Sequence, residues 1–152
     1  IPPERVLYIH GCLNGEPLVF GHGMQYSGLQ NMMEKYEKVE EGDYVYQRAK
    51  DSALSSVASH KKNVDEIIRE HIKWFDRLSN ITDIHIFGHS LGAVDLPYFY
   101  KIFDSCDKKK VRVEISCFDD EAKEKALSLI KESSIPLSHY NPITLESLQV
   151  LK

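Results

Sequence analysis

The 152-residue chain has few cysteines, no long apolar run and no excess of basic residues. Its three cysteines, Cys12, Cys106 and Cys117, form no C-x-x-C pair, which argues against a disulfide scaffold and predicts free thiols in a cytoplasmic protein. The apolar runs are too short for a membrane span or a signal peptide. With a net charge of −4 and a pI near 6.0, a general nucleic-acid surface is not expected.

The composition is that of a globular domain, with 42% hydrophobic and 28% charged residues. The length predicts a single α/β domain over residues 1–152. Strand-like and helix-like segments alternate, which favours a Rossmann-like, three-layer arrangement around a mainly parallel sheet. Because the chain opens without methionine and almost directly on a strand-like segment, we expect a fragment of a longer protein.

Hydrophobic periodicity sets the expected elements. Short apolar or alternating runs predict strands over residues 5–11, 16–23, 83–87 and 111–118. Helical spacing predicts helices from Tyr44, over 64–78, around 98–103, over 119–133 and over 143–152.

A glycine-rich turn at Gly88-His89-Ser90-Leu91-Gly92 fits the G-x-S-x-G pattern of a serine-hydrolase nucleophile elbow. In that hypothesis Ser90 is the nucleophile, and the later residues of the triad are Asp119 or Asp120, followed by His139. The chain order Ser, Asp, His is the one that α/β-hydrolases use.

The residues after this turn favour a different interpretation. In an elbow the helix begins just after the nucleophile, which would place Pro97 inside the helix at a cost of about 3 kcal/mol. If Asp95 is the N-cap instead, Pro97 falls in the first turn, where proline is tolerated. Residues 88–94 then form a loop that leads to the positive end of a helix, a setting suited to an anionic group such as a phosphate.

Other glycines stand at the ends of the expected strands, beside histidines. If the strands are parallel, their carboxyl ends meet at one edge of the sheet, where open α/β sheets bind ligands. We therefore expect Gly11, Gly21, Gly23 and Gly88 to converge there, with His10, His22 and His89 beside them. These histidines lack the spacing of metal ligands, so no metal is expected.

Two segments carry a family resemblance. "YIHGCLNGEPLVFGHG" at residues 8–23 and "IHIFGHSLGAVDLPYF" at residues 84–99 together resemble the phage abortive-infection AbiH family. The resemblance implies a bacterial antiphage protein, in which an infected cell stops growing or dies. Members of the family usually begin with a strand and a Gly-Asn-Gly-Phe-Asp-type loop, so this chain looks like the part of the pattern that follows them.

A more distant similarity links the same two segments to sirtuin-type NAD-binding domains. It implies that His10 is a catalytic residue near the nicotinamide ribose, with NAD or a related nucleotide as the substrate. It also implies that Gly88, Ser90 and Leu91 line the nucleotide site, with Asp95 as a cap or a ribose ligand. The full set of residues expected for nucleotide binding is Gly11, Asn14, Gly21, Gly23, Gly88, His89, Ser90, Leu91 and Asp95.

Three functions stay open at this point. The first is an AbiH-like defence protein that binds a nucleotide such as NAD and acts on it as an NAD-cleaving hydrolase, or binds it without cleavage. The second is a serine hydrolase that uses Ser90. The third is a non-catalytic module that senses a phage trigger protein or joins copies of itself into a homo-oligomer.

Overall fold

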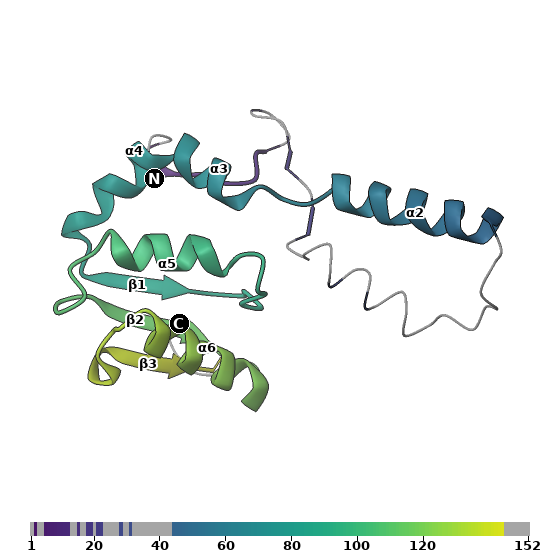
Figure 1. Ribbon diagram of the computed structural model, residues 1–152. Coiled ribbons are helices and arrows are strands. Elements are labelled where there is room, and N and C mark those ends of the chain that lie inside the picture. The colour runs from purple at the N-terminus through teal and green to yellow at the C-terminus, as the bar shows by residue number, and fades with distance from the viewer. Residues whose placement is uncertain are drawn as a thin grey trace. The chain divides into compact units, whose positions relative to one another are not determined.

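The computed structural model describes residues 2, 5–12, 15, 18–19, 21–22, 28, 31 and 44–144. The chain forms two compact units, residues 1–63 and residues 64–152. Figure 1 labels the helices and strands. The prediction of one domain over the whole chain stays a prediction.

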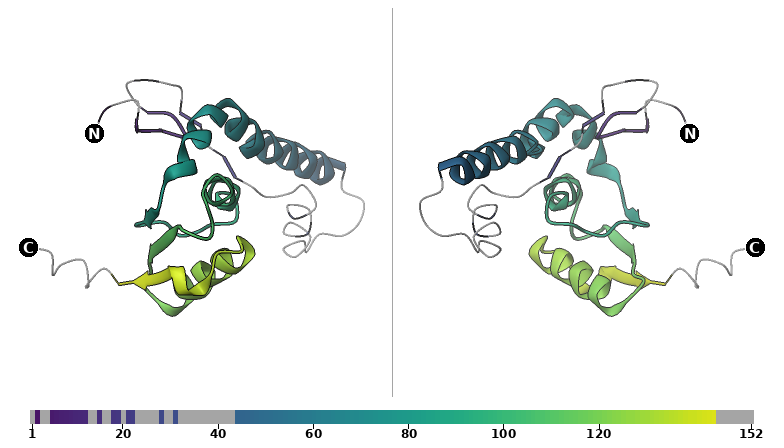
Figure 2. Two further views of the ribbon diagram at one scale, coloured as in Figure 1. Left: turned by 90° about the vertical axis from the view of Figure 1, so that its left-hand side faces the viewer. Right: turned by 90° about the vertical axis from the view of Figure 1, so that its right-hand side faces the viewer.

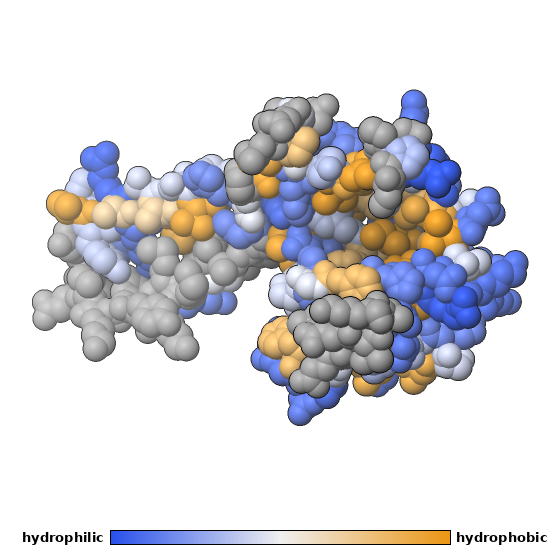
Figure 3. Space-filling model, turned by 180° about the vertical axis from the view of Figure 1, so that it is seen from behind, coloured by the Kyte–Doolittle hydropathy of each residue, from blue (hydrophilic) through white to orange (hydrophobic). Residues whose placement is uncertain are grey.

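The first unit contains the helix α2, Tyr44–Ser59. Its helical character was predicted from Tyr44 onward and is confirmed. Leu54 of α2 is buried, whereas Val45 is 75% exposed. Figure 3 shows hydrophobic residues along the surface of this helix. A single parallel bridge pairs His22 with Lys61, just beyond the end of α2.

The strand predicted over residues 5–11 is wrong. In the structure this segment contains a turn, in which the amide of Gly11 donates to the carbonyl of Tyr8 at 2.8 Å. A strand needs a partner strand to satisfy its backbone groups, and among the described residues no sheet includes this segment, although the His10 carbonyl accepts from the amide of Val19 at 2.9 Å. The apolar run at Val6 and Tyr8 is therefore exposed rather than buried in a sheet.

The second unit begins with a broken helical segment. The apolar stripe over residues 64–78 predicts one helix, but the structure has three short ones. They are α3 (Val64–Glu70), α4 (Ile72–Phe75) and the 3-10 helix η2 (Asp76–Asn80). The interruption falls at His71, and the stripe still buries Ile67 and Phe75.

The sheet of the second unit has three parallel strands in the order β1-β2-β3. They are β1 (Asp83–Ile86), β2 (Arg112–Ser116) and β3 (Tyr140–Ile143). The strands predicted over residues 83–87 and 111–118 are confirmed, and so is their parallel pairing. Two helices connect them, α5 (Leu96–Asp104) and α6 (Asp120–Glu132), both of which were predicted.

Both connecting helices lie on the same face of the sheet (Figure 2). Right-handed crossovers between neighbouring parallel strands produce this arrangement. The core lies between the sheet and these helices, with Val113 and Ile115 of β2 packed against Phe103, Leu129 and Ile130. Within the second unit no described helix covers the other face, so the predicted third layer is not found among the described residues.

The strand β3 was not predicted. Pro142 interrupts its pattern, and a proline argues against a central strand. It is tolerated because β3 is an edge strand. The carbonyl of Ile143 accepts from the amide of Cys117 at 2.8 Å, so the backbone groups of Ile143 point toward β2. Successive residues of a strand point their backbone groups to opposite sides, so the nitrogen of Pro142 points away from β2, where no donor is needed. The helix predicted over residues 143–152 lies almost wholly outside the described residues.

Two expectations from composition can be compared with the structure. All three cysteines are unpaired, as predicted. In the described part of the chain, no helix has both the length and the apolar character needed to cross a membrane.

We expect Leu129→Ala to lower the free energy of unfolding by about 2–5 kcal/mol, because Leu129 is 1% exposed in the core. Glu124→Ala, an exposed position on the same helix, should change it by less than about 0.5 kcal/mol. Urea unfolding followed by circular dichroism measures both. Equal effects would contradict the assignment of this face of α6 to the core.

Candidate functional site

The loop between β1 and α5 is the part of the predicted site that the structure describes in full. It leaves the sheet at Gly88, whose φ of 63° lies in the left-handed region. The amide of Gly88 donates to the Ser116 hydroxyl on β2 at 3.0 Å. The loop is therefore fastened to the central strand where it leaves β1.

His89 holds the middle of this loop. Its Nδ1 accepts the backbone N–H of Leu91 at 2.8 Å, so the proton of the neutral ring is on Nε2. Nε2 lies 3.6 Å from the carboxylate of Asp95, and the ring meets Phe99 edge-on, with centroids 4.8 Å apart. With both nitrogens engaged in the loop, His89 positions the backbone and is not a free base.

Leu91 has the second unusual backbone conformation of the loop. Its φ of 51° is left-handed, which costs a residue with a side chain about 1–2 kcal/mol. The Leu91 side chain is 5% exposed and belongs to the hydrophobic core. The backbone N–H of Leu91 donates the hydrogen bond that His89 accepts. Burial and this hydrogen bond compensate for the backbone strain.

The helix α5 starts where the sequence predicts. Asp95 is the N-cap residue and Pro97 stands in the first turn. The Asp95 side chain makes no capping hydrogen bond and lies near His89 instead. Burial raises the pKa of Tyr98 to about 12, and the negative charge of Asp95 adds to the shift.

The loop presents hydrogen-bond donors next to the start of a helix. Within the described part of the chain, the amides of Ser90, Gly92 and Ala93 have no hydrogen-bond partner, and Ser90 is exposed. These amides and the positive end of the α5 dipole suit an anionic group. Binding of an anion at this loop stays a prediction, and the Asp95 carboxylate lies at the same helix start.

The structure does not bring the residues of the serine-hydrolase hypothesis together. Ser90 follows the carboxyl end of β1, whereas His139 precedes β3 and donates through Nδ1 to the Val111 carbonyl at 3.1 Å. In a parallel sheet these positions lie at opposite ends. Asp119 is the N-cap of α6, where its side chain accepts from the amide of Ala122 at 2.7 Å. Asp120 pairs with Lys123 at 2.8 Å.

The other predicted site residues belong to the first unit or lie outside the described residues. Nζ of Lys62 lies 3.3 Å from Nε2 of His10, and Nε2 of His22 donates to the Val57 carbonyl at 2.8 Å. A Cβ on Gly21 would lie 2.4 Å from the His60 carbonyl oxygen, so a close backbone approach explains this glycine. The convergence of His10, Gly11 and Gly21 with the loop of the second unit stays a prediction. The predicted site residues outside the described residues are Asn14 and Gly23.

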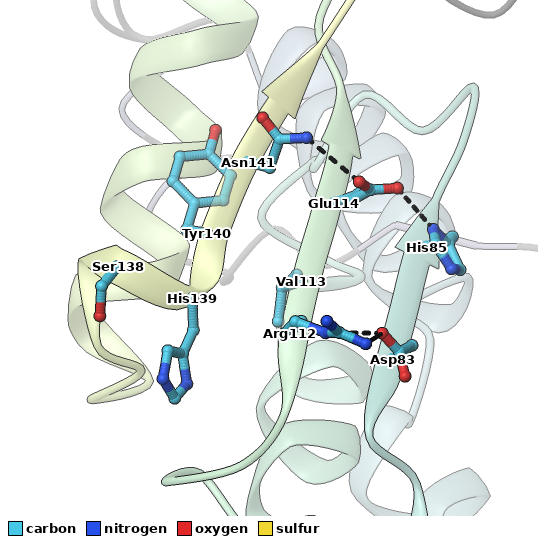
Figure 4. A pocket seen from close by; sticks show the side chains of 9 residues that line it. All are labelled: Asp83, His85, Arg112, Val113, Glu114, Ser138, His139, Tyr140 and Asn141. Atoms are coloured by element: carbon cyan, nitrogen blue, oxygen red, sulfur yellow. Dashed lines mark hydrogen bonds and ion pairs between the residues drawn. The ribbon is translucent and has the colours of Figure 1, made fainter.

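A second polar site, which the sequence analysis missed, lies on the open face of the sheet (Figure 4). A cavity of about 370 Å³ is bordered by all three strands and by η3, the 3-10 helix Leu137–His139. Its lining residues are Asp83, His85, Arg112, Val113, Glu114, Ser138, His139, Tyr140 and Asn141. The alternating polar residues of "DIHI" and "RVEIS" are the sequence signal, but only the strand register places them side by side.

Ion pairs and hydrogen bonds fix the polar groups of this cavity. Arg112 pairs with Asp83 at 2.7 Å, and His85 pairs with Glu114 at 2.8 Å. Asn141 donates to the other oxygen of Glu114 at 3.1 Å. The hydrogen bond from Thr82, followed by Arg112, holds the pKa of Asp83 below its usual value.

Metal binding has no support among the described residues. No three His, Cys, Asp or Glu side chains in that part of the chain come together as a metal site requires. His85 and Glu114 form a pair only.

The family model for Bacteriophage abortive infection AbiH matches residues 1–117, which include the whole loop between β1 and α5 and end just after β2. No curated protein and no solved structure matches the chain.

We expect Gly88→Ala to lower the free energy of unfolding by about 1–2 kcal/mol, because a side chain is strained at a φ of 63° even though the space around it is open. Gly92→Ala is the matched control in the same loop. Its Cβ would lie 3.7 Å from the Ser90 hydroxyl, an ordinary contact, so the unfolding energy should hardly change. A larger loss for Gly92→Ala in urea unfolding would contradict this loop conformation.

The protein should not react with a fluorophosphonate probe at Ser90. The strained backbone of a nucleophile elbow is absent at Ser90, because the positive φ angles fall on Gly88 and Leu91. His139 is also at the other end of the sheet. Mass spectrometry of labelled protein tests this, with a known serine hydrolase as the positive control. Stoichiometric labelling that Ser90→Ala removes would restore the hydrolase hypothesis.

Proposed function

Because the chain belongs to the AbiH family, we propose that it acts in antiphage defence by binding a nucleotide such as NAD at the loop between β1 and α5. The observation that carries the defence role is the family match over residues 1–117. The loop lies within this match, as do the other described elements up to the end of β2.

The chemistry of the loop supports a phosphate-bearing ligand. The amides of Ser90, Gly92 and Ala93 lie beside the N-terminus of α5, and the Ser90 hydroxyl is exposed. A diphosphate has oxygen acceptors for such donors, and its negative charge is stabilised by the helix dipole. In this proposal His89 keeps the loop in the binding conformation through its hydrogen bond from Leu91.

Cleavage is the second part of the proposal. Hydrolysis of NAD adds water across the bond between nicotinamide and ribose, giving nicotinamide and ADP-ribose. The candidate catalytic residue is His10, whose Nε2 lies 3.3 Å from Nζ of Lys62.

We expect Ser90→Glu to weaken NAD binding about tenfold or more and to abolish phage protection, because a carboxylate in the loop repels a phosphate. Ser79→Glu adds the same charge at an exposed position outside the loop and should preserve both. The measurements are calorimetric titration with NAD and plaque counts on bacteria that express the protein.

The outcomes separate the parts of the proposal. If the unaltered protein protects bacteria but does not bind NAD, the defence role is supported and nucleotide binding is refuted. No protection in any form would remove the defence role. For cleavage, His10→Ala should bind NAD and fail to consume it, and full consumption by this variant would refute the catalytic role of His10.

A further inference from the structure

The charged groups of the cavity on the open face already have partners. Asp83 pairs with Arg112 and accepts a second hydrogen bond from Thr82 at 2.6 Å. One oxygen of Glu114 accepts from His85, and the other accepts from Asn141. These contacts pair each charged side chain of the cavity with a partner, so they favour an uncharged ligand.

The neutral groups of the cavity are still available to a ligand. A carboxylate and a carbonyl can only accept, so His85 and His139 both donate through Nδ1, to Glu114 and Val111. In the neutral rings both Nε2 atoms are therefore acceptors. Among the described residues, nothing donates to these two Nε2 atoms or to the side-chain oxygen of Asn141.

Donors stand beside these acceptors. Ser138 has a hydroxyl that both donates and accepts, and Arg112 retains N–H groups beyond those that reach Asp83. Figure 4 shows Asn141, Glu114 and His85 in one row across the strands, with Arg112 and Asp83 in the next row. His139 and Ser138 border the same cavity beside the start of β3.

The size of the cavity limits the ligand. Its volume of about 370 Å³ is at the lower end of the range of roughly 300–1,000 Å³ for small-molecule sites. A cavity that offers both hydrogen-bond acceptors and donors suits ligand groups that can both donate and accept hydrogen bonds. Hydroxyl groups have this property, and several of them on one small ring match several polar residues on one sheet face.

We propose that this cavity binds a small, uncharged polyol of the size of a monosaccharide. Asn141, His85 and His139 accept from its hydroxyls, while Arg112 and Ser138 donate to them. The site differs from the loop between β1 and α5, which follows the carboxyl end of β1, whereas Asp83 and Arg112 begin their strands. It does not depend on the proposed function.

The test is a titration of the protein with D-ribose, D-glucose and myo-inositol, followed by backbone amide chemical shifts. We expect a saturable shift confined to residues of the cavity for at least one of them. Asn141→Leu, an exposed position on the edge strand, should weaken that binding threefold or more. Ser138→Ala should also weaken polyol binding. Ser79→Ala, outside the cavity, should leave it unchanged.

Three results would overturn the proposal. The first is the absence of a saturable shift at the cavity with all three polyols. The second is tighter binding of ribose 5-phosphate than of ribose, which would mean that the site recognises an anion. The third is unchanged polyol binding in Asn141→Leu. Ser90→Glu should retain polyol binding, so a failure of the nucleotide proposal is distinguishable from a failure of this one.

Discussion

The parallel pairing of β2 with both of its neighbours is the constraint on which the second unit depends. Side chains alternate along a strand, so the register that buries Val113 and Ile115 against the helices also puts Arg112 and Glu114 on the opposite face. A slip of one residue would exchange the two sets. The core and the polar cavity are thus two results of the same register.

The same strand also fixes the loop. Ser116, at the end of β2, accepts the amide of Gly88, and Leu91 returns from the loop into the core. The loop is held at both points, with His89 between them. The conformation of the loop therefore depends on contacts with buried residues.

The sequence predicts the second unit better than the first, for physical reasons. Strong periodicity identifies β1, β2 and α6, and the positions of Asp95 and Pro97 correctly give the start of α5. The apolar run near Val6 resembles a strand just as well, but a run of this kind cannot show whether a partner strand exists. The cavity was missed because its residues are up to 58 positions apart, from Asp83 to Asn141, and only strand register joins them.

The proline of β3 has a consequence for the growth of the sheet. A further strand would have to pair with one of the two edges, and pairing needs donors along that edge. Pro142 removes a donor from the middle of the outer edge of β3, a four-residue strand. A strand added on that side would lack one hydrogen bond from β3. Pairing is therefore less favoured beside β3 than beside β1, in which every residue carries a backbone N–H.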